Sequence, residues 1–124
     1  MNLDIDLSLW YNFLIKYTGE VTMIRHTIMW KFTDEFEGMN KDQIMTRVEE
    51  CFAHLLTVIP EIKAMRVERD ILRSERSFDM IYITEFESLD ALETYRVHPE
   101  HVKVAKFIGA VRTAQAVTDT EIAE

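Results

Sequence analysis

The chain has 124 residues, enough for one domain built around one hydrophobic core. Its formal net charge of −8, from 14 basic and 22 acidic residues, speaks against partners that are nucleic acids or anionic membranes. A single cysteine, no apolar run of about 20 residues, and acidic Asp4 and Asp6 where a signal peptide needs basic residues together predict a cytoplasmic protein.

Residues 1–22 differ from the rest and are expected to form an N-terminal extension to a domain of residues 23–124. Four of their side chains recur at helical spacing, namely Leu7, Trp10, Tyr11 and Leu14. Asp6 suits the start of such a helix and Gly19 its end. Leu3, Ile5, Leu7 and Leu9 also alternate as a strand would, so both interpretations stay open.

The clearest elements of the first half are a strand and a helix. Residues 23–32 alternate and predict a strand, whose more apolar face carries Ile24, His26, Ile28, Trp30 and Phe32. Residues 41–59 predict a helix with one apolar stripe, made of Ile44, Val48, Cys51, Phe52, Leu55 and Ile59. Asn40 and Gln43 fit a capping box at its start, and Pro60 ends it.

The next two predicted strands cover residues 62–72 and 78–87. The second carries apolar side chains on both faces: Met80, Tyr82, Thr84 and Phe86 on one, Ile81 and Ile83 on the other. A single layer of helices covers only one face of a sheet. The other face is therefore expected to pack against a second sheet.

The last elements are two short helices and a strand. Ser88 suits the start of a helix that runs through Tyr95, and Pro99 opens another, whose inward stripe is Val104, Ala105 and Ile108 and whose end lies near Gly109. Residues 111–118 predict the final strand. The order βαββαβ indicates an α+β, ferredoxin-like fold: four antiparallel strands with two helices on one face, paired two-fold as a homodimer.

Three segments resemble the stress-responsive A/B barrel domain family. They are residues 23–26 at the first strand, residues 78–88 at the third, and the run Tyr95-Arg-Val-His98-Pro99-Glu-His101-Val. The resemblance covers roughly residues 23–119. It implies a ferredoxin-like subunit in a dimeric α/β barrel, in a family whose members mostly have no assigned reaction.

A plant branch of this family closes polyketide chains by aldol chemistry, and the resemblance carries its tyrosine and histidine onto Tyr95 and His101, with His26 near the pocket. Trp30, Tyr82 and Thr84 depart from that branch, which indicates a narrower or more polar pocket. Residues expected to contact a ligand there are Ile28, Trp30, Phe52, Tyr82, Val104 and Ile108.

Each histidine has a structural interpretation beside the functional one. His98, just before Pro99, suits a helix cap, and a metal site with His101 lacks the third and fourth ligands that such sites need. His101 is either a hydrogen-bonded core residue or a general base with a pKa near working pH. Tyr95 and His26 are likewise either packing residues or members of the same site.

Two functions follow from these alternatives. The first is a homodimeric stress-response protein of unassigned activity that binds a small apolar ligand in a cavity between sheet and helices. The second is a cyclase or lyase that abstracts a proton next to a carbonyl group with Tyr95 and His101. Neither needs a cofactor or a metal. A third, oxygenation without haem or flavin, rests on shared fold alone.

Overall fold

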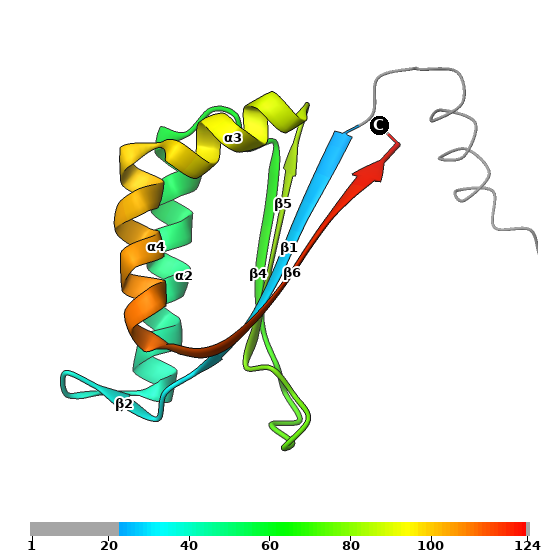
Figure 1. Cartoon of the computed structure of the whole chain (residues 1–124). Coiled ribbons are helices and arrows are strands. Elements are labelled where there is room, and N and C mark those ends of the chain that lie inside the picture. The colour runs from blue at the N-terminus through cyan, green and yellow to red at the C-terminus, as the bar shows by residue number, and fades with distance from the viewer. Residues whose placement is uncertain (1–22, 124) are drawn as a thin grey trace, which may run out of the picture.

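The computed structural model describes residues 23–123, so the predicted extension over residues 1–22 lies outside the described part. One sheet has the antiparallel strand order β4-β5-β1-β6, formed by Ala64–Arg69, Met80–Phe86, Met23–Phe32 and Arg112–Ile122. The helices α2 (Lys41–Val58), α3 (Leu89–Val97) and α4 (Pro99–Val111) lie on one side of it (Figure 1). The predicted α+β, ferredoxin-like arrangement is confirmed.

The helices begin at the caps that the sequence predicts. At α2 the Asn40 side chain accepts a hydrogen bond from the Gln43 backbone N–H at 2.8 Å, and Gln43 accepts one from the Asn40 N–H at 2.9 Å. At α4 the Nδ1 atom of His98 accepts from the Glu100 N–H at 3.1 Å, and Pro99 occupies the first turn. These bonds satisfy backbone donors that would otherwise have no partner.

The core lies between the sheet and the helices. Trp30 is 1% exposed, and its ring stacks on those of Phe52 and Tyr82 at centroid distances of 5.6 and 5.7 Å. Phe52 and Tyr82 stack on each other at 4.0 Å. The aromatic face of β1 and β5 therefore meets α2 directly, as their alternation predicts.

Several boundaries differ from the predicted ones. A hairpin of β2 (Glu35–Phe36) and β3 (Met39–Asn40) was not predicted; its turn needs Gly38 at φ +84°. Strand β6 runs to Ile122 because β1 pairs with it over almost its whole length. Helix α4 passes Gly109 and continues to Val111, and Ala105 is exposed although it lies on the predicted inward stripe.

The sheet face away from the helices has no described element over it (Figure 1). Its centre is apolar or small and half-buried, and is formed by Thr27, Met29, Ile81, Ile83, Ala114 and Ala116.

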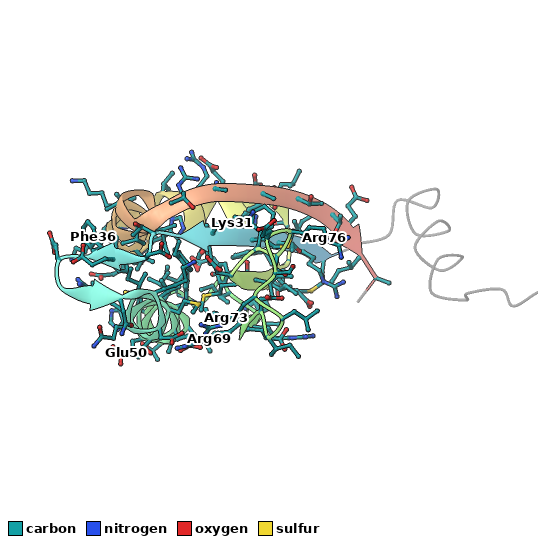
Figure 2. The ribbon with its side chains drawn as sticks, turned by 90° about the horizontal axis from the view of Figure 1, so that it is seen from below. Lys31, Phe36, Glu50, Arg69, Arg73 and Arg76 are labelled. Atoms are coloured by element: carbon teal, nitrogen blue, oxygen red, sulfur yellow. The ribbon has the colours of Figure 1, made fainter. Side chains whose placement is uncertain are left out.

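At the lower end of the molecule, Arg69 and Arg73 both approach Asp42 of α2 (Figure 2). Within residues 23–123, no helix has the length and apolar character that crossing a membrane requires.

Candidate functional site

A cavity of about 330 Å³ lies between β1 and β6 on one side and α3 and α4 on the other. Ligand-binding cavities in proteins run from roughly 300 to 1,000 Å³, so this one suits a small molecule. His26, Tyr95 and His101 all line it, and so they converge on one space although they come from three different elements. One end of the cavity carries these three side chains.

His101 is held by the end of the preceding helix. Helix α3 stops at Val97, which leaves its last carbonyl groups without helical partners. The carbonyl of Arg96 accepts a hydrogen bond from Nδ1–H of His101 at 2.9 Å. A carbonyl oxygen only accepts, so the neutral ring carries its proton on Nδ1 and a lone pair on Nε2.

The surroundings of His101 favour this neutral form. Burial lowers the pKa of His101 below its ordinary value of 6.5, and the nearby charge of His26 acts in the same direction, while the hydrogen bond to the Arg96 carbonyl opposes it. Among residues 23–123, Nε2 has no hydrogen-bonded protein partner. The ring therefore presents a basic nitrogen.

The ring of Tyr95 packs against that of His101. The centroids of Tyr95 and His101 are 4.2 Å apart, and the Tyr95 hydroxyl shares a hydrogen bond of 2.7 Å with the hydroxyl of Tyr82. Both side chains are almost fully buried, and burial raises the pKa of each phenol. Both therefore stay protonated at neutral pH and serve as hydrogen-bond donors.

His26 completes the polar end of the cavity from the sheet. Its Nδ1–H donates to the carboxylate of Asp119 at 2.5 Å, and the two residues face each other in the pairing of β1 with β6. Its ring lies 6.5 Å from the rings of both Tyr82 and Tyr95. The carboxylate thus fixes the tautomer and the direction of the His26 ring.

Most of the residues expected to contact a ligand line the cavity: Ile28, Trp30, Phe52, Tyr82 and Ile108. Val104 does not. It is 7% exposed and borders the groove between α2 and α4, on the side of α4 away from the sheet cavity. Val104 and Ile108 lie on the same apolar stripe of α4, so the sequence pattern did not distinguish them. The stripe is wide enough to pack against both a helix and the sheet.

Strand β6 supplies cavity residues that the sequence did not single out, and they alternate along it: Gln115, Val117 and Asp119. Leu92, Arg96, Ala105 and Arg112 line the cavity as well. Pairing the predicted last strand, residues 111–118, with the first would have placed Gln115 and Val117 opposite Trp30 and Ile28, and Asp119 lies one residue beyond that strand. In residues 23–123, no group of three or more His, Cys, Asp or Glu side chains is arranged to hold a metal ion.

Comparison with known proteins gives a family and several relatives. The model of the Stress responsive A/B Barrel Domain matches residues 24–122. The chain is 27% identical over 81 residues to olivetolic acid cyclase from Cannabis sativa, an alignment that covers 64% of this chain and 76% of the cyclase.

Solved structures share the fold. A dimeric ferredoxin-like protein of unknown function from Bacteroides fragilis superposes with a TM-score of 0.72 at 26% identity, over 81% of this chain and 96% of that one. A dimeric ferredoxin-like protein from Thermobifida fusca gives 0.71 at 19% identity, over 82% and 92%. Hydroxynitrile lyase from Passiflora edulis gives 0.69 at 16% identity, over 82% and 94%.

Proposed function

This chain belongs to the stress-responsive A/B barrel domain family, and from that premise we propose that it is a homodimer that abstracts a proton next to the carbonyl group of a small apolar compound. The compound binds in the cavity between sheet and helices. The observation that carries the proposal is the hydrogen bond from His101 Nδ1–H to the Arg96 carbonyl, which leaves a basic Nε2 in a cavity with buried phenols. The similarity to olivetolic acid cyclase supports an enzyme in this family.

The proposed step uses groups of this chain alone. A proton passes from the carbon next to the carbonyl to Nε2 of His101, and the electron pair of the broken C–H bond moves into an enolate. In this step Tyr95 accepts a hydrogen bond from the Tyr82 hydroxyl, with which it is in contact at 2.7 Å, and donates its own O–H to the enolate oxygen. His26, oriented by Asp119, provides a second polar contact at the same end. The enolate then takes back a proton or attacks a second carbonyl, as in a ring closure.

The test is proton exchange on methyl hexyl ketone in deuterium oxide, followed by NMR. We expect the folded protein to accelerate the exchange of the hydrogens next to the carbonyl above the rate in buffer and in protein unfolded by urea. Binding of the ketone without exchange would instead make the chain a ligand-binding protein. Neither binding nor exchange would refute both functions.

The dimer is proposed from the uncovered sheet face. Ile81 and Ile83 of β5 are half-buried there beside Met29 of β1, and the neighbours from Bacteroides fragilis and Thermobifida fusca are dimeric. We expect the chain to sediment as a dimer at micromolar concentration and Ile83→Lys to sediment as a folded monomer. The reason is that the variant would bury a charge without a partner in the contact between the two sheets, which disfavours the dimer.

Leu56→Lys is the matched control for the dimer, because Leu56 is 48% exposed on α2, on the helical side of the molecule. It should remain dimeric. A wild-type chain that sediments only as a folded monomer, or two variants that behave alike, would contradict pairing through this face.

A further inference from the structure

The cavity has a second polar end, opposite His101. Helix α4 starts near His101 and ends at Val111, and Arg112 follows directly as the first residue of β6 (Figure 1). Arg112 and Gln115 line this end of the cavity, and Asp119 lines the other. Asp119 and Gln115 lie on the same face of β6, so at about 3.3 Å per residue the two ends are on the order of 13 Å apart.

Gln115 presents hydrogen-bond donors at this end. Its Oε1 accepts a hydrogen bond from the indole N–H of Trp30 at 3.0 Å. An indole N–H only donates, so the bond fixes which side of the amide is oxygen and leaves the NH₂ group of Gln115 without a protein acceptor in the described part of the chain. The NH₂ group provides two donors for a ligand.

Arg112 adds a positive charge beside these donors. The other arginine of the cavity, Arg96, is held by the carboxylate of Glu93 through two hydrogen bonds of 2.7 and 2.8 Å. Of the cations that line the cavity within residues 23–123, Arg112 alone has no carboxylate within 4.0 Å. In a chain with a net charge of −8, an arginine without an acidic partner at a cavity is a candidate for binding an anion.

The middle of the cavity is apolar, with Ile28, Ile108 and Val117 between the two ends. One water molecule, with its single non-hydrogen atom, occupies about 30 Å³ in the liquid. The cavity of 330 Å³ therefore accommodates a ligand of on the order of ten non-hydrogen atoms. A ligand that satisfies every part has a carbonyl group at His101, a short aliphatic chain, and an anionic group at Arg112.

We propose that Arg112 and Gln115 bind the carboxylate of the substrate, which makes the substrate class short aliphatic keto acids. The assignment of the keto group rests on the proposed function; the assignment of the carboxylate does not. Arg112 is therefore a residue that determines specificity, and it takes no part in proton transfer at the far end.

The test separates the two ends by measuring binding of octanoate, which has the carboxylate but no keto group, and of octanol, which lacks the charge. We expect Arg112→Gln to weaken octanoate binding in calorimetry roughly ten- to a hundredfold, the scale of a hydrogen bond to a charged group, and to leave octanol unchanged. Gln115→Glu should weaken octanoate binding more than Arg112→Gln does. It keeps an acceptor for the Trp30 indole N–H, but it places a carboxylate beside Arg112.

Arg76→Gln is the matched control. Arg76 lies in the loop between β4 and β5, outside the cavity lining, and its replacement removes the same charge. It should leave octanoate binding unchanged. Equal losses for octanoate and octanol in Arg112→Gln, an unchanged affinity, or no octanoate binding by the wild type would each overturn the proposal.

Proton exchange distinguishes this failure from that of the proposed function. Arg112→Gln should show less preference for a keto acid over methyl hexyl ketone than the wild type does, because it loses the carboxylate contact and keeps His101 and Tyr95. In the wild type, the keto acid that carries a carboxylate in place of the terminal methyl group should be exchanged at lower concentration than the ketone. Exchange of the ketone with no preference for the keto acid would overturn the carboxylate site and leave the proton-transfer site standing.

Discussion

Replacing His101 with alanine should lower the rate of proton exchange on methyl hexyl ketone by roughly 100- to 10,000-fold, the usual contribution of a general base. The reason is that Nε2 of His101 is the basic atom, held in place by the bond from Nδ1–H to the Arg96 carbonyl. The measurement is the NMR exchange assay at neutral pH, together with urea unfolding at one fixed protein concentration.

His98→Ala is the control within the same motif. His98 caps α4 through the Glu100 N–H, so its loss should lower the free energy of unfolding by about 1 kcal/mol and leave exchange nearly unchanged. If His101→Ala changes only the stability, or if both variants lose exchange equally, His101 is a core residue and the enzymatic interpretation should be dropped.

The pH dependence has a definite sign. The pKa of His101 is lowered by burial, so the neutral base persists as the pH falls below 6.5, and exchange should decline only at lower pH. The same shift affects stability. Because the folded pKa lies below the unfolded one, the stabilisation is complete above pH 6.5 and is lost as the pH falls through the folded pKa. This part of the loss of stability at low pH should be missing in His101→Ala.

Removing either hydroxyl of the Tyr82–Tyr95 pair should lower the free energy of unfolding by about 1–3 kcal/mol, because the remaining buried hydroxyl loses its partner. The double variant Tyr82→Phe with Tyr95→Phe should cost less than the sum of the two single variants, because no hydroxyl is then left unpaired. Urea unfolding of the four proteins measures this coupling. Strictly additive losses would show that the hydrogen bond contributes nothing.

The two phenols should differ in the exchange assay. Tyr95→Phe removes the donor to the enolate oxygen, and loss of one such donor typically lowers a rate by about 100- to 1,000-fold. Tyr82→Phe leaves the Tyr95 hydroxyl in place and should retain most of the rate. The opposite order would assign the donor to Tyr82, and equal rates in all proteins would remove both phenols from the chemistry.

The sequence by itself determined the order of elements, because each is encoded locally. Alternation defines β1 and β5, the capping box of Asn40 and Gln43 starts α2, and Pro99 starts α4. The apolar stripe of α4 showed that His101 faces inward, since a helical period needs no knowledge of the partner element. The convergence of His26, Tyr95 and His101 also followed once these faces were assigned to one side of the sheet.

Only the tertiary structure decided what these side chains bind. The partners of His26, Trp30 and Tyr82 are 93, 85 and 13 positions away in the chain. Such pairs depend on the register of β1 against β6 and on how α3 packs on β5. Alternation along one strand shows which residues share a face, but it does not show which residue of a second strand stands opposite each of them. For the same reason the roles of Asp119, Gln115 and Arg112 became visible only when β6 was paired with β1.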